Sequence, residues 1–137
     1  MGRIMAIDYG TKRVGVAVTD SSRIIATGLK TVSAKDIISF LKEYFSKEQV
    51  DCLVLGEPKK LDNTPSDSAK YVEQFLVSLK TNFPDLKIER IDERFSSQMA
   101  FQTMIDSGLK KKDRQNKELV DEISATILLQ SYMEKIS

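Results

Sequence analysis

Two β-rich runs joined by a short glycine turn open the chain and constrain its fold more than any other segment. Residues 4–20 read IMAIDYGTKRVGVAVTD, with Gly10 in the connection between the runs. This pattern predicts an antiparallel hairpin. Asp8 stands at the end of the first run, where a buried carboxylate needs a cation, a proton or hydrogen-bond partners. Asp8 therefore marks a place to hold a metal or a phosphate, or it caps its own turn.

Beyond the hairpin, apolar residues at steps of two predict strands, and apolar residues at steps of three or four predict helices. The expected elements are, in order, a strand at 23–32, a helix capped by Ser33, a strand at 50–56, a helix from Ala69 to about Asn82, a strand at 86–91, and two helices, one from Ser96 or Ser97 to Gly108 and one from about Glu118.

The order βββαβαβαα predicts an α/β fold with a mixed five-stranded sheet, three antiparallel strands followed by two parallel ones, flanked by helices. One arrangement of this sheet has the first strand at the centre and the fifth strand parallel beside it. Gly10 is expected to allow a tight turn, and Gly15 a close packing contact. In the last helix, the small residues Ser124 and Ala125 are expected to let Asp121 approach the sheet.

The length of 137 residues, with 41% hydrophobic and 30% charged residues, predicts one soluble domain over 1–137. No apolar run approaches the ~20 residues that span a bilayer, and no signal peptide is recognisable, so a cytoplasmic location is expected. The single cysteine, Cys52, excludes an internal disulfide and a zinc cluster built from several thiolates.

The chain contains no histidine, which excludes Ser-His-Asp and Cys-His nucleophiles and histidine metal sites. Hydrolytic chemistry would have to rest on carboxylates, lysine, tyrosine or a bound metal. The net charge of +1 provides no strong overall field for nucleic acid. Positive charge is instead concentrated locally, at Lys110, Lys111, Lys112, Arg114 and Lys117.

Three acids, Asp8, Glu93 and Asp121, each end or interrupt an apolar element. If the first and fifth strands are parallel neighbours, their C-terminal ends meet at the edge where α/β sheets bind ligands. Carboxylate oxygens without nitrogen or sulfur ligands favour Mg²⁺ or Mn²⁺. Two such ions can support phosphodiester hydrolysis without histidine. The alternatives are a turn cap for Asp8, a salt-bridge partner for Glu93 and a dipole-stabilising helix acid for Asp121.

Three segments of the chain resemble the motifs of the YqgF (RuvX) family: IDYGTKRVGVAV at 7–18, DERFSS at 92–97 and VDEISATILLQ at 120–130. The resemblance implies a ribonuclease H-like fold, an acidic site of Asp8, Glu93 and Asp121, and a divalent-metal-dependent nuclease. The family is associated with maturation of the 5′ end of 16S ribosomal RNA, and was earlier proposed to resolve Holliday junctions.

The chain departs from the family pattern at two places. Glu57 introduces an acid where many relatives have leucine, and residues 62–64 read DNT where relatives commonly carry a glycine. Asparagine can adopt a left-handed turn as glycine does, so Asn63 is expected to leave this loop unharmed. Ribonuclease H-like sites often have a fourth acid, for which Asp92, Glu122 and Asp20 are candidates.

Residues around these acids are candidates for holding the phosphates of a nucleic acid, although surface cations often only interact with water. They are Gly10, Thr11, Lys12, Arg13, Arg94, Lys110, Lys111 and Lys112. The leading hypothesis is an endonuclease acting on structured RNA, for which the resemblance names pre-16S ribosomal RNA. Cleavage of branched DNA is the first alternative. A phosphotransfer domain, as in sugar kinases and actin-like ATPases, would need a second domain, and a non-catalytic nucleic-acid-binding module is the third alternative.

Overall fold

The computed structural model describes residues 2–20, 22, 26–57, 69–92 and 117–136. The described elements confirm the expected sequence of strands and helices. They are β1 (Arg3–Tyr9), β2 (Arg13–Thr19), β3 (Ala26–Ser33), the 3-10 turn η1 (Ala34–Asp36), α1 (Ile37–Lys47), β4 (Val50–Glu57), α2 (Ala69–Asn82), β5 (Lys87–Asp92) and α5 (Lys117–Ile136). The helix expected between Ser96 or Ser97 and Gly108 lies outside the described residues.

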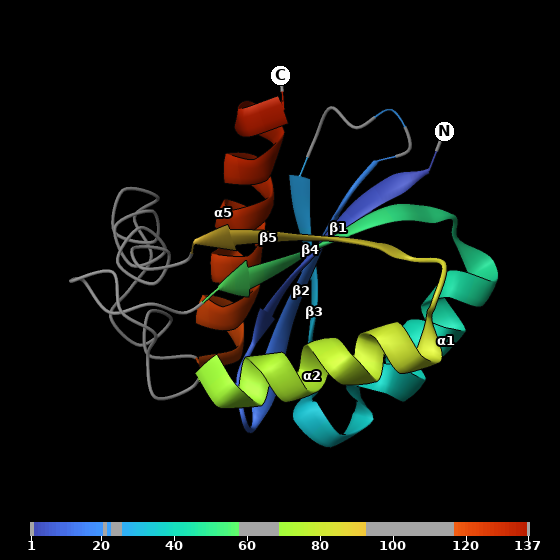
Figure 1. The fold of residues 1–137 in the computed structure, drawn as a ribbon. Coiled ribbons are helices and arrows are strands. Elements are labelled where there is room, and N and C mark those ends of the chain that lie inside the picture. Colours follow the sequence, from blue (N-terminus) through green and yellow to red (C-terminus); the bar gives the residue numbers. More distant parts are fainter. Residues whose placement is uncertain (1, 21, 23–25, 58–68, 93–116, 137) are drawn as a thin grey trace.

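The five strands form one mixed sheet in the order β3-β2-β1-β4-β5 (Figure 1). Strands β1, β2 and β3 are antiparallel neighbours, whereas β4 is parallel to β1 and β5 is parallel to β4. The predicted fold class is confirmed, and β1 is central. The fifth strand is not beside the first, however, because the crossover through α1 brings β4 directly against β1. The second crossover, through α2, then places β5 at the sheet edge.

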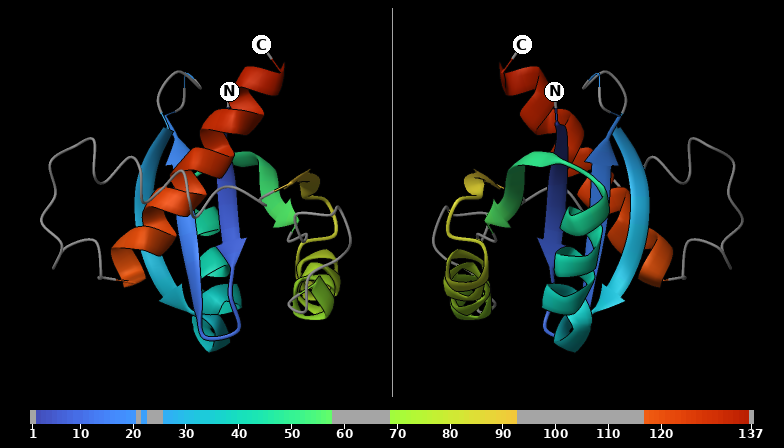
Figure 2. Two further views of the ribbon diagram at one scale, coloured as in Figure 1. Left: turned by 90° about the vertical axis from the view of Figure 1, so that its left-hand side faces the viewer. Right: turned by 90° about the vertical axis from the view of Figure 1, so that its right-hand side faces the viewer.

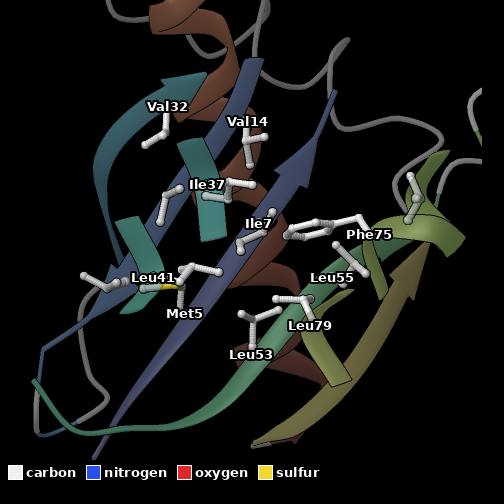
Figure 3. Packing of buried hydrophobic residues seen from close by; sticks show 13 residues of the cluster. Met5, Ile7, Val14, Val32, Ile37, Leu41, Leu53, Leu55, Phe75 and Leu79 are labelled. Atoms are coloured by element: carbon white, nitrogen blue, oxygen red, sulfur yellow. The ribbon is translucent and has the colours of Figure 1, made fainter. Parts of the chain in front are cut away.

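Helices α1 and α2 cover one face of the sheet and bury its larger hydrophobic core. Figure 3 shows the side chains of β1, β2 and β4 meeting those of the two helices in this layer. The core residues labelled there are Met5, Ile7, Val14, Val32, Ile37, Leu41, Leu53, Leu55, Phe75 and Leu79. At its end nearest the hairpin, Tyr9 stacks on Phe75 with ring centroids 4.4 Å apart. This contact ties the end of β1 to α2, so Tyr9 serves in packing.

Among the described elements, helix α5 covers the opposite face, where it crosses β1, β2 and β3 (Figure 2). Its apolar stripe of Ala125, Leu128, Leu129 and Tyr132 is buried against the alternate residues of the central strands. Those strand residues are Ile4, Ala6, Ala17, Cys52 and Val54. The helix begins near the β1–β2 hairpin and ends near the start of the chain, so its first turns lie over the hairpin end of the sheet.

Two local features differ from the expectation or sharpen it. Ser33 is the last residue of β3 and the N-cap residue of η1, as expected, but its side chain makes no capping hydrogen bond. Strand β3 bears a register shift opposite Val16 and Ala17, which bends this edge strand. No helix in the described part of the chain is long and apolar enough to cross a membrane.

Candidate functional site

The candidate site lies at the C-terminal end of β1, on the face of the sheet that α5 covers. Side chains alternate along a strand, and Met5 and Ile7 point into the α1–α2 core. Asp8 therefore shares the other face with Ile4 and Ala6, which pack against α5. Asp8 is half-buried. The central strand thus presents one carboxylate toward the first turns of α5.

Two backbone hydrogen bonds fix the turn that follows Asp8, one inside the turn and one from the first residue of η1. The amide of Gly10 donates to the carbonyl oxygen of Arg13 at 2.9 Å, and a Cβ on Gly10 would stand 2.6 Å from that oxygen. The carbonyl of Lys12 accepts a hydrogen bond from the amide of Ala34 at 2.9 Å. Gly10 therefore permits the tight turn as predicted, and the side chains of Thr11 and Lys12 remain exposed on a fixed backbone.

Gly15 is where the last helix meets the hairpin. It pairs with Asp8 across the β1–β2 ladder, so it lies directly opposite that acid on the same face. A Cβ on Gly15 would overlap the carbonyl oxygen of Asp121 and stand 3.2 Å from its Cβ. The expected close packing at Gly15 is confirmed. Directly opposed residues of antiparallel strands have side-chain positions about 5 Å apart, so Asp8 and Asp121 both lie beside Gly15.

Asp121 forms an ion pair that sequence reasoning did not predict. The Nε of Arg13 donates to Oδ2 of Asp121 at 3.1 Å, and the two side chains are 37% and 25% exposed. Arg13 lies two residues before Gly15, so both belong to the face that α5 covers. The spacing of Arg13 and Gly15 was the only feature of the sequence that could have indicated the ion pair. It does so only once α5 is known to cross β2 at Gly15.

Several predicted site residues are not placed by the structure. Glu93, Arg94, Lys110, Lys111 and Lys112 lie outside the described residues, as do residues 62–64. Among the residues that are described, no three acidic, cysteine or histidine side chains gather as a metal site. The end of β5 is two strand spacings, about 10 Å, from β1. The last described residue of β5, Asp92, therefore ends a strand that is not adjacent to β1.

The fold separates the three candidates for a fourth acid. Asp20 follows β2, which runs antiparallel to β1. It therefore lies near the N-terminal end of β1, at the other end of the strands from Asp8, and is excluded from this site. Glu122 lies over β3, where its Cβ would be 3.5 Å from a Cβ built on Gly28. Asp92 ends β5 and pairs in register with Glu57 of β4, at the same edge as Asp8.

Comparison with solved structures defines the class of fold. The chain is similar to RuvC of T. thermophilus in complex with a Holliday junction substrate, with a TM-score of 0.60 and 16% identity over 99% of this chain and 96% of that one. A second T. thermophilus RuvC structure gives a TM-score of 0.55 at 13% identity, covering 98% and 96% of the two chains. The chain has a ribonuclease H-like fold.

Comparison of sequences defines the family within that class. A family model described as RuvX, Holliday junction resolvase, matches residues 2–135. A protein of Flavobacterium psychrophilum named "Putative pre-16S rRNA nuclease" is 59% identical over 135 residues, which are 98% of each chain. A protein of the same name from Bacteroides thetaiotaomicron is 53% identical over 98% of this chain and 97% of its own. The chain belongs to the RuvX family.

Proposed function

We propose that this chain is a divalent-metal-dependent endonuclease that hydrolyses phosphodiester bonds in structured RNA, as one nuclease domain spanning 1–137. The observation that carries the proposal is that Asp8 and Asp121 both lie next to Gly15. This point is at the C-terminal end of β1, where α/β folds bind ligands. The names of relatives with 53–59% identity support pre-16S ribosomal RNA as the substrate.

The proposed metal ligands are Asp8, Asp121 and Glu93. The two described acids fit a divalent ion, because both offer hard oxygen donors from half-buried positions on rigid elements. An all-oxygen set in a chain without histidine favours Mg²⁺ or Mn²⁺. When bound, such an ion lowers the pKa of a water and stabilises the charge that develops on the leaving oxygen.

The residues of the hairpin turn are proposed to hold the substrate. Lys12 and Thr11 are exposed beside Asp8, and the turn that carries them is fixed by two backbone hydrogen bonds. A cation on a fixed turn can bind a backbone phosphate and align the neighbouring bond with the carboxylates. We assign Gly10 and Arg13 to the same region, and Arg94, Lys110, Lys111 and Lys112 to more distant phosphates.

Cleavage of branched DNA is the second candidate function. It is favoured by the description of the matched family as a Holliday junction resolvase. The hairpin would serve both substrates, because contacts to phosphates do not depend on base sequence. A direct comparison of a pre-16S leader RNA with a four-way DNA junction separates the two functions.

Replacing Asp8 or Asp121 by asparagine tests the proposal. Asp8→Asn and Asp121→Asn keep the side-chain volume but remove the negative charge, so each is expected to lower Mg²⁺- or Mn²⁺-dependent cleavage by at least about 10³-fold. Cleavage of both substrates is followed on gels, and circular dichroism checks the fold.

Asp85→Asn is the matched control for these variants, because Asp85 is exposed in the turn between α2 and β5. Its cleavage rate is expected to equal that of the wild type. Equal rates for wild type and Asp8→Asn would exclude the proposed role of Asp8. If the wild type binds both substrates and cuts neither, the chain is a non-catalytic binding module.

A further inference from the structure

Arg13 could bind a phosphate of the substrate or an acid of the site. It follows the proposed phosphate-binding turn, but its guanidinium contacts Asp121. Its Nε is 3.1 Å from Oδ2 of Asp121. Lys12, the adjacent cation, is exposed and has no ion-pair partner among the residues that the structure describes. The two neighbouring cations of the hairpin therefore differ. Lys12 can bind a phosphate directly, whereas Arg13 must first leave Asp121.

The contact between Arg13 and Asp121 is imposed by backbone packing. The carbonyl of Arg13 accepts a hydrogen bond from Gly10, and its Cα is paired with Ser33 of β3. The carbonyl of Asp121 is pressed against Gly15, two residues along the same strand. Both residues are fixed at the Cα, and the long arginine side chain can leave the contact by rotating. At 37% exposure it has access to water for that movement.

The charges around Gly15 explain what the contact does. Asp8 lies opposite Gly15 and the backbone of Asp121 lies against it, so two half-buried acidic residues approach the same point of the sheet. Like charges near one another destabilise a fold unless a cation lies between or beside them. The guanidinium of Arg13 supplies that positive charge from within the chain. A divalent ion at the same carboxylates would supply it from outside.

We propose that Arg13 is a built-in counterion of Asp121, which holds Oδ2 of Asp121 until a divalent ion takes that oxygen. The inference rests on the proposed function, since it requires Asp121 to be a ligand. Arg13 is then a positioning residue that acts through Asp121. It stabilises the protein without metal and competes with metal binding, because one carboxylate oxygen cannot serve both partners fully.

The inference is tested by Mn²⁺ binding and by thermal unfolding, neither of which depends on catalysis. Arg13→Gln is expected to bind Mn²⁺ about three- to tenfold more tightly than the wild type in titration calorimetry, since no cation must be displaced. In EDTA the same variant is expected to unfold at a lower temperature than the wild type. Saturating Mn²⁺ is expected to abolish that difference.

Two further variants serve as matched controls. Arg13→Lys keeps the positive charge and is expected to restore Mn²⁺ affinity to within about twofold of the wild type. Arg3→Gln removes an arginine of similar exposure, 28%, that pairs with Glu48 where β1 begins, at the other edge of the sheet. Its Mn²⁺ affinity is expected to be unchanged, and any loss of thermal stability is expected to persist in Mn²⁺.

The results separate this inference from the proposed function. Unchanged or weaker Mn²⁺ binding by Arg13→Gln, with normal binding by the wild type and loss of binding in Asp121→Asn, overturns the role of Arg13 alone. Equal Mn²⁺ binding by wild type and Asp121→Asn overturns the assignment of Asp121 as a ligand, and with it the proposed metal site.

Discussion

Gly15 is the residue on which the candidate site is built. It lies opposite Asp8 in the β1–β2 ladder and against the backbone of Asp121. The absence of a side chain therefore allows Asp121 to approach the strand pair at the position of Asp8. Arg13 reaches Asp121 from the same strand face. The functional geometry at this point depends on a residue that performs no chemistry.

Gly15→Ala tests this dependence. Its Cβ would overlap the carbonyl oxygen of Asp121, which belongs to helical backbone and cannot rotate away. We expect the unfolding free energy to fall by about 1–3 kcal/mol, as for other overpacked sites, and cleavage to fall with it as α5 shifts. Urea denaturation and a cleavage assay measure the two effects.

Gly28→Ala provides the comparison, because a Cβ there would meet only side-chain atoms, the nearest being Oγ1 of Thr126 at 3.2 Å. A much smaller loss of stability is expected for this variant. If Gly15→Ala were as stable and as active as the wild type, the close approach of α5 would not be required for the site.

Helix α5 has two functions among the elements of the fold. Its stripe of Ala125, Leu128, Leu129 and Tyr132 buries one face of the sheet, and its first turns carry Asp121. The small, buried residues Ser124 and Ala125 lie in the part that comes closest to the strands. The same packing therefore stabilises the protein and places an acid of the candidate site.

Leu129→Ala measures the structural function of α5. Leu129 is fully buried between the helix and the sheet, so its truncation leaves a cavity in the smaller core. We expect the unfolding free energy to fall by about 2–5 kcal/mol in chemical denaturation. Ile136→Ala, at a position 55% exposed near the end of the same helix, is expected to change it by less than about 0.5 kcal/mol. Similar losses for both variants would contradict the packing described for α5.

At the scale of the whole molecule, the candidate site occupies one edge of the sheet and the charge of the protein is nearly balanced. The net charge is +1, so attraction for nucleic acid must come from local groups of cations. Lys12 is one exposed cation beside the acids. The cluster Lys110, Lys111 and Lys112 is proposed to be such a group.

Replacing Lys110, Lys111 and Lys112 together by glutamine tests that cluster. The change lowers the net charge from +1 to −2. If all three lysines contact phosphates, the slope of log affinity against log salt is expected to decrease in magnitude by about 2–3. Fluorescence anisotropy with a labelled pre-16S leader RNA measures it. An unchanged slope would show that the cluster does not contact the RNA.

Much of the fold was predictable from particular residues. The β-rich run before the turn at Gly10 predicted β1, and apolar residues at steps of three and four predicted α5. The predictions about Gly10, Gly15 and the fold class are confirmed. The assignment of Asp8, Glu93 and Asp121 as catalytic stays a prediction. The supposition that β5 lies beside β1 was wrong, because β4 lies between them, and Ser33 takes the predicted N-cap position without a side-chain hydrogen bond.

By itself, the sequence determined the elements, the faces they bury and the family to which the chain belongs, because side-chain periodicity and short motifs are local properties. The tertiary structure alone decided that β4 separates β1 from β5, that Asp20 lies at the far edge and that Arg13 pairs with Asp121. These relations depend on which way each crossover turns and where a helix crosses a strand. They join residues as far apart as 13 and 121, whose contact no local pattern specifies.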